Sequence, residues 1–233
     1  MIVDINFNFH SDSSGGDPDS KSPTLKKYHK FLWSKELPCG KFFELKDYPN
    51  KYLIHNSDIG QFFFGSDSIS HSYRNQKSKK NITKLIPNEV DELWNNGSTI
   101  GAFIIFPCNK IERKFTINQA RGCNSWIDDR FDLTLECIRL FYENKISPLY
   151  ETLSRYKTFF NLFNNFRGFV DFFFLQDLIE NDEKIKFHLP FDGFKTKPKI
   201  VSVNEYLVYK ENVENFIQKR NKRIQDYTKT FVF

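Results

Sequence analysis

Apolar and polar residues alternate over residues 2–9, which is the periodicity of a half-buried β-strand. Residues 51–57 and 61–67 are rich in β-branched and aromatic side chains, and a short segment that ends in Gly60 lies between them. A glycine-containing segment between two such runs predicts a β-hairpin. Apolar runs predict further strands over residues 99–107 and 184–189.

The first clear helix signal is Ser22 followed by Pro23, an N-capping residue before a proline in the first turn. The helix that they predict places Leu25, Tyr28 and Leu32 on one face. Helical periodicity predicts further helices over residues 87–96, 129–144, 148–163 and 203–227, of which the third repeats the cap-then-proline signal.

Strand patterns therefore concentrate in the N-terminal half of the chain and helix patterns in the C-terminal half. This segregation favours the α+β class over a regular alternation of strands and helices. We predict a single domain over residues 1–233, with a mainly antiparallel sheet from the N-terminal half packed by the C-terminal helices.

The composition indicates a folded protein with an aromatic core. Hydrophobic residues make up 39% and charged residues 27% of the chain, which argues against disorder. Phenylalanine occurs 27 times and methionine once, so rings must supply much of the buried area. A net charge of +5 permits contact with nucleic acid without requiring it.

The N-terminus carries acidic residues where a signal peptide needs basic ones, and no apolar stretch reaches the length of a membrane span. We therefore expect a cytoplasmic protein with no membrane partner, and its oligomeric state is left open. The cysteines form no CxxC pair and predict reduced thiols: Cys39, Cys108, Cys123 and Cys137.

The segment after residue 128 combines fixed charge with core-forming residues. Asp132, Glu136, Arg139 and Glu143 share one stripe of the predicted helix. One interpretation is an exposed ladder of ion pairs. The other places Asp132 and Glu136 in a cleft, where two carboxylates one turn apart could act as acid and base or hold a divalent cation.

Arg121 and Arg130 flank the predicted start of this helix, and Gly122 would let the backbone approach a ligand closely. Two guanidinium groups near free helix amides are typical of a phosphate site. The alternative is that both arginines pair with nearby acids and lock the turn, through Asp128, Asp129 or Asp132.

Two further candidates lie near the N-terminus. Asp17 and Asp19 flank a proline in a loop containing glycines, from which they could reach a metal ion, although an EF-hand would need more ligands. In the other interpretation these aspartates cap the following helix. His29 is a catalytic candidate, but a lone histidine on a partly apolar face is more often structural.

Two basic clusters could contact phosphates of a nucleotide or nucleic acid, although such clusters are usually solvated faces. One comprises Arg74, Lys77, Lys79 and Lys80, and the other comprises Lys219, Arg220, Lys222 and Arg223. The chain has no P-loop, no dinucleotide-binding glycine motif, no nucleophile elbow and no HExxH motif. These absences disfavour the common nucleotide hydrolases, oxidoreductases, α/β-hydrolases and zinc proteases.

Four long motifs resemble an uncharacterised bacterial and phage-associated family of hypothetical proteins. They are DPDSKSPTLKKYHKFLWSKELPCG, TINQARG, DRFDLTLECIR and SPLYETLSRYKTFFNLF, and the resemblance runs from about residue 7 to residue 223. It implies a single-domain, soluble prokaryotic or viral protein. It transfers no catalytic residue, because the family has none assigned.

Two hypotheses of function follow. In the first, the protein is an enzyme acting on a phosphate-bearing substrate, a nucleotide or nucleic acid, with the charged residues above as its site. In the second, it is a non-catalytic interaction module, of a phage-defence or mobile-element system, and these charges are structural.

Overall fold

The computed structural model describes residues 1–231, and its strands all come from the N-terminal half. A three-stranded antiparallel sheet has the order β3-β4-β5, formed by Leu53–Ser57, Gly60–Ser68 and Phe103–Pro107. Ile54 pairs with Phe63 and Ser66 with Ile105. A second, smaller antiparallel pair joins β1 (Lys35–Glu36) to β2 (Phe42–Phe43). The predicted hairpin and the α+β class are confirmed.

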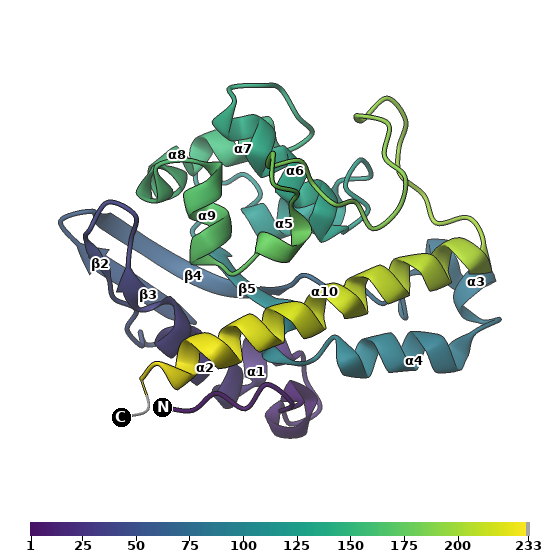
Figure 1. Cartoon of the computed structure of the whole chain (residues 1–233), viewed down its shortest axis with the longest axis horizontal. Helices are drawn as coiled ribbons and strands as arrows, with labels where there is room; N and C mark the ends of the chain where they lie inside the picture. Colours follow the sequence, from purple (N-terminus) through teal and green to yellow (C-terminus); the bar gives the residue numbers. More distant parts are fainter. Residues whose placement is uncertain (232–233) are drawn as a thin grey trace.

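Helices surround this sheet, and the longest of them crosses the whole molecule. In Figure 1, α10 (Val203–Lys229) runs along the long axis, with α5 to α9 on one side and α1, α2 and α4 on the other. The remaining α-helices are α1 (Pro18–Lys21), α2 (Pro23–Trp33), α3 (Lys80–Thr83), α4 (Pro87–Asn96), α5 (Ile117–Cys123), α6 (Phe131–Tyr142), α7 (Tyr150–Arg155), α8 (Lys157–Phe160) and α9 (Phe166–Phe172).

The start of α2 follows directly from its capping residues. The Ser22 hydroxyl accepts the Leu25 amide at 3.0 Å and donates to Asp12 at 2.5 Å. Asp12 also accepts the amide of Thr24 at 3.0 Å. Ser22 thus satisfies one free amide of the helix and Asp12 satisfies another, which ties the N-terminal loop to α2.

Two predicted strands are wrong. Residues 2–9 form turns that lead into a 3₁₀ helix (Phe9–Asp12), although Val3 and Phe9 are buried as the alternation suggested. The amide of Phe9 donates to Ser98 O at 2.9 Å, so this segment is held by isolated contacts instead of a strand partner. Residues 184–189 make one isolated bridge, between Ile185 and Ile179.

Two other elements differ in extent. The predicted strand at 99–107 starts with a 3₁₀ turn (Ile100–Ala102), and only its second half joins the sheet as β5. The predicted helix at 148–163 is divided into α7, α8 and a final 3₁₀ turn (Asn161–Phe163), and it begins after Leu149. The helices predicted at 87–96 and 203–227 are confirmed, and the one at 129–144 begins two residues later, at Phe131.

Aromatic rings fill the space between the sheet and the C-terminal helices. Phe163 packs against Phe172 and Phe169, with ring centroids 5.1 and 5.3 Å apart. Phe159 reaches the sheet by contacting Phe64 at 5.8 Å. The predicted aromatic core is thus confirmed. Among residues 1–231, no helix combines the length and apolar content needed to cross a bilayer.

Candidate functional site

A cavity of about 460 Å³ lies where the N-terminal segment meets the end of β4. Residues from four separate parts of the sequence line it. Its carboxyl groups belong to Asp17, Asp19, Asp67 and Asp129, and its imidazoles to His10 and His71. Of the sequence-predicted residues, the structure therefore brings Asp17 and Asp19 into a cavity, together with acids from β4 and from the turn before α6.

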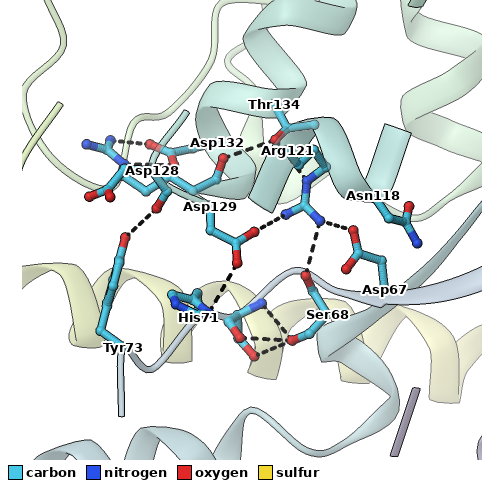
Figure 2. A network of polar contacts seen from close by, with 12 residues as sticks. Asp67, Ser68, His71, Tyr73, Asn118, Arg121, Asp128, Asp129, Asp132 and Thr134 are labelled. Carbon is cyan, nitrogen blue, oxygen red and sulfur yellow. Dashed lines mark hydrogen bonds and ion pairs between the residues drawn. The ribbon is translucent and has the colours of Figure 1, made fainter. Parts of the chain in front are cut away.

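Arg121 forms the polar base behind this cavity. Helix α5 begins with a capping box in which Thr116 accepts the Gln119 amide and Gln119 accepts the Thr116 amide. One turn later the fully buried Arg121 points at the end of β4 (Figure 2). Its Nη1 donates to the Asp67 carboxylate.

The remaining contacts of Arg121 fix its orientation. Its Nε donates to Thr134 Oγ1 at 3.0 Å, and its Nη2 lies 3.6 Å from Asp129 Oδ1. The other oxygen of Asp129 lies 3.2 Å from His71 Nδ1. Figure 2 shows these groups as one chain of contacts running from α6 through the arginine to the loop after β4. The guanidinium thus has two carboxylates as partners.

Asp19 and Asp67 share the cavity but differ in their partners. The Ser66 hydroxyl donates to Asp19 Oδ1 at 2.7 Å, whereas the Asp67 carboxylate accepts a hydrogen bond from the charged guanidinium of Arg121. Burial and the neighbouring Asp67 raise the pKa of Asp19 to about 8. Burial also raises the pKa of Asp67, to about 6, because Arg121 offsets part of the effect. The more acidic of the two carboxyl groups is therefore the one beside the arginine.

The turn that presents Asp129 is held in an uncommon conformation. Asp128 and Asp129 both have left-handed backbone angles, with φ of 49° and 56°. The hydroxyl of Tyr73 donates to Asp128 O at 2.9 Å, and Lys79 Nζ lies 2.9 Å from the Asp128 carboxylate. Left-handed non-glycine residues cost free energy and persist only where surrounding contacts impose them.

Arg130 and Asp132 do not line the cavity. They form a buried pair of their own, in which Arg130 Nε donates to Asp132 Oδ1 at 3.2 Å. The amide of His188 donates to Asp132 Oδ2 at 2.9 Å. Burial would raise the pKa of Asp132, but His188 and Arg130 outweigh it and lower that pKa. The alternative that these residues lock the turn agrees with this geometry.

The rest of the α6 stripe forms the predicted ladder of ion pairs. Arg139 binds both oxygens of Glu136, at 2.8 and 2.9 Å, and it also contacts Glu143. Glu136 lines a different cavity, of about 580 Å³, beside Trp126 and Ile146. The catalytic roles of Asp132 and Glu136 stay predictions, because neither side chain lines the cavity in front of Arg121.

His29 and Gly122 also lie outside the cavity. His29 is fully buried, its Nδ1 is 3.1 Å from the Tyr52 hydroxyl, and burial lowers its pKa to about 3. It is therefore a neutral histidine of the core. Gly122 is exposed on α5, where a Cβ atom would meet nothing within 4 Å. No close approach of the backbone requires glycine there.

The expected metal role of Asp17 and Asp19 stays a prediction. Asp17 caps α1, because its carboxylate accepts the Asp19 amide at 3.2 Å. Over residues 1–231, no group of three or more His, Cys, Asp or Glu side chains is arranged to hold a metal ion. All four cysteines are free.

Cations of both basic clusters take part in ion pairs. In the first cluster Arg74 lies 3.1 Å from Asp91, and Lys79 pairs with Asp128 as described above. In the second, Arg223 binds Asp177, with Nη2 and Oδ1 3.0 Å apart. These pairs reduce the positive charge available to a nucleic acid.

The sequence pattern alone missed Asp67 and its neighbours. Ser66, Asp67 and Ser68 interrupt an otherwise apolar strand, and this interruption was the available signal. The apolar residues of this strand are explained by the predicted hairpin. The three polar residues at its end can be identified as part of a site only once the structure shows that Arg121 faces them.

The family comparison matches residues 3–224 to the model of a family of unknown function (DUF6994). No curated protein and no solved structure matches the chain.

Proposed function

Because the chain belongs to this family of unknown function, its activity has to be inferred from its own site, and we propose that it is an enzyme using Asp19 and Asp67 as an acid–base pair. The observation that carries the proposal is the shared cavity, in which one carboxyl group contacts Arg121 and the other receives only a serine hydroxyl. When their surroundings give two carboxyl groups different pKa values, one can act as the acid and the other as the base.

At neutral pH the two groups carry different charges. Asp19, with a pKa of about 8, is protonated and can donate a proton, whereas Asp67, with a pKa of about 6, is ionised and can accept one. The Asp67 side chain is 20% exposed, so it can reach a ligand in the cavity. Arg121 stabilises the charge of Asp67 and keeps it oriented.

The charge of the cavity favours a neutral or cationic substrate. Four carboxyl groups line the cavity, and the arginine behind it already contacts two of them. A phosphate group would meet net repulsion there, so the phosphate roles of Arg121, Arg130 and Gly122 are not part of this proposal. A nucleotide remains a substrate only if its phosphates lie outside the cavity.

We propose that the pair hydrolyses a glycosidic or N-glycosidic bond, a reaction that uses one protonated and one ionised carboxyl group. Asp19 gives its proton to the departing oxygen or nitrogen as the bond to the sugar carbon breaks. Asp67 removes a proton from the water that adds to that carbon. The proton then passes from Asp67 through solvent back to Asp19, so the pair is restored.

Nitrophenyl glycosides and unmodified nucleosides are suitable probes for this chemistry. We expect turnover of at least one of them with a bell-shaped pH dependence, rising near pH 6 as Asp67 ionises and falling near pH 8 as Asp19 loses its proton. Asp19→Asn and Asp67→Asn should each lower kcat by about 100- to 10,000-fold. The control is Asp58→Asn, on the exposed hairpin turn. Lack of turnover with every probe, or full activity in both cavity variants, would refute the proposal.

A non-catalytic interaction module is the second candidate. The mutual pairing of Arg130 with Asp132 and of Glu136 with Arg139 favours it, because these charges then serve stability alone. Its test is the stability of variants in these pairs, described below.

A further inference from the structure

Arg220 is a buried cation with neutral partners. It lies on α10 with no exposed surface, and its Nη1 donates to the carbonyl oxygens of Gly101 and Phe103, both at 2.8 Å. Its Nε donates to Phe173 O at 3.1 Å. Within residues 1–231, no carboxylate affects the pKa of this guanidinium, and burial alone lowers it to about 9. It therefore stays charged at neutral pH, without a counterion from the described chain.

Three buried nitrogens, on side chains that pack together at Trp33, have no hydrogen-bond partner. They are Nη2 of Arg220, Nε1 of Trp33 and Nε2 of His29. All three side chains are fully buried. The Arg220 Cζ lies 5.8 Å from the centre of the Trp33 ring, and the His29 ring lies 6.4 Å from it. A buried donor without a partner lowers the stability of the fold. Three such nitrogens on neighbouring side chains therefore indicate a missing acceptor.

His29 is a donor as well in one of its two neutral tautomers. When the Tyr52 hydroxyl donates to Nδ1, at 3.1 Å, the proton of the neutral imidazole is on Nε2. Trp33 Nε1 and Arg220 Nη2 can only donate. In this tautomer all three unpartnered atoms are donors, and an anion can accept from all three, whereas a water molecule accepts at most two hydrogen bonds.

A second basic group, the half-buried Lys35, lies nearby. Lys35 Nζ donates to Phe172 O at 2.5 Å and lies over the rings of Trp33 and Phe174. Burial and the charge of Arg220 lower the pKa of Lys35 to about 7. The buried charge of Arg220, which has only neutral partners, favours a bound counterion.

We propose that a halide-sized monoanion, chloride in ordinary solutions, binds inside the protein against Arg220 Nη2, Trp33 Nε1 and His29 Nε2. The site lies between α2 and α10, and it does not depend on the proposed function of the Asp19–Asp67 cavity. Its effect is to neutralise the cation that holds α10 against β5.

Crystals of the full chain grown with sodium bromide in place of chloride test the site directly. We expect an anomalous bromine peak within hydrogen-bonding distance of Arg220 Nη2. An ordered water without anomalous signal, or no density between the three nitrogens, would overturn the proposal.

Melting temperatures in chloride and in gluconate at equal ionic strength provide the solution test. Chloride should raise the wild-type melting temperature saturably, by about 2–4 °C. Trp33→Phe removes one donor while keeping an aromatic ring, and it should abolish most of this rise. Trp126→Phe is the matched control, because Trp126 lines a separate cavity, and it should keep the rise. An equal response of all three proteins would identify a general salt effect and contradict an internal site.

Discussion

Burial and the proximity of Asp67 keep the Asp19 carboxyl protonated at neutral pH. A carboxyl group whose pKa is raised on folding binds a proton more tightly in the folded state than in the unfolded one. The free energy of unfolding therefore falls as pH rises from the ordinary pKa of 3.8 to about 8. The acid that we propose is thus maintained at the expense of stability.

Asp19→Asn should remove this pH dependence, because an amide does not ionise. We expect the variant to melt no lower than wild type at pH 5 and at least about 2–4 °C higher at pH 9, a difference that corresponds to about 1 kcal/mol. Thermal melts from pH 4 to pH 9 measure it. In the control Asp58→Asn, the exposed partner Lys41 lowers the carboxyl pKa, so its difference from wild type should not grow with pH. A constant difference for Asp19→Asn would contradict the raised pKa.

Two carboxylates on α6 should differ sharply in their contribution to stability. Asp132 is fully buried against Arg130, and Asp132→Ala should lower the free energy of unfolding by about 3–5 kcal/mol because it leaves that arginine uncompensated. The Arg139 side chain is 20% exposed and also binds Glu143, so Glu136→Gln, which keeps a hydrogen-bond acceptor, should cost only about 1 kcal/mol. Chemical denaturation measures both. Comparable losses would contradict the structural assignment of the buried pair, and full stability of both variants would count against the interaction-module hypothesis.

Helix α2 shows how a local signal and a long-range contact combine at the scale of an element. The Ser22 cap was readable from the sequence, but its partner Asp12 lies ten residues earlier and was not. The alternation at residues 2–9 failed for a related reason. A strand needs a neighbouring strand to pair with, and the amide of Phe9 finds a loop carbonyl instead.

Ser22→Ala should therefore cost about 1–2 kcal/mol, at the upper end for an N-cap, because it removes both the helix cap and the hydroxyl that Asp12 accepts from. Urea denaturation measures the loss. Ser20→Ala is the control, since that exposed hydroxyl contacts only Asp17 O at 3.3 Å, and it should be nearly neutral. Equal effects of the two substitutions would show that Ser22 does not act as a cap.

At the scale of the whole molecule, α10 joins the two halves of the chain. Gly101 lies where this helix crosses the start of β5, and its amide donates to Asn221 Oδ1 at 2.6 Å. A Cβ atom on Gly101 would come within 2.6 Å of Ile217 O, which is backbone and cannot rotate away. The approach of α10 thus depends on the missing side chain.

Gly101→Ala should lower the free energy of unfolding by more than about 2 kcal/mol, because α10 must shift to admit the methyl group. Gly122→Ala has open space around it and lies in a helix, so it should be neutral or stabilising by up to about 1 kcal/mol. The comparison uses denaturation of both variants. A tolerated alanine at position 101 would contradict the close packing of α10. A loss of stability at position 122 would contradict the open environment described for it.

The sequence alone determined the elements that local chemistry specifies. Periodicity and capping residues identified the central hairpin, α4, most of α6 and α10, and the phenylalanine content determined the aromatic core. The same reasoning identified the charged groups near Arg121 and their two possible roles, and it selected Asp17 and Asp19 as site candidates.

Only the tertiary structure decided which charges belong together. Arg121 lies 54 residues after Asp67 in the chain, and Asp19 lies 47 residues before Ser66, so no local pattern links them. Pairing between groups far apart in the sequence depends on the fold, because the strength of an ion pair is set by the distance between the charges and by their burial. For the same reason the sequence could not separate the buried Arg130–Asp132 pair from the cavity beside it, nor show that Arg220 is enclosed without a counterion.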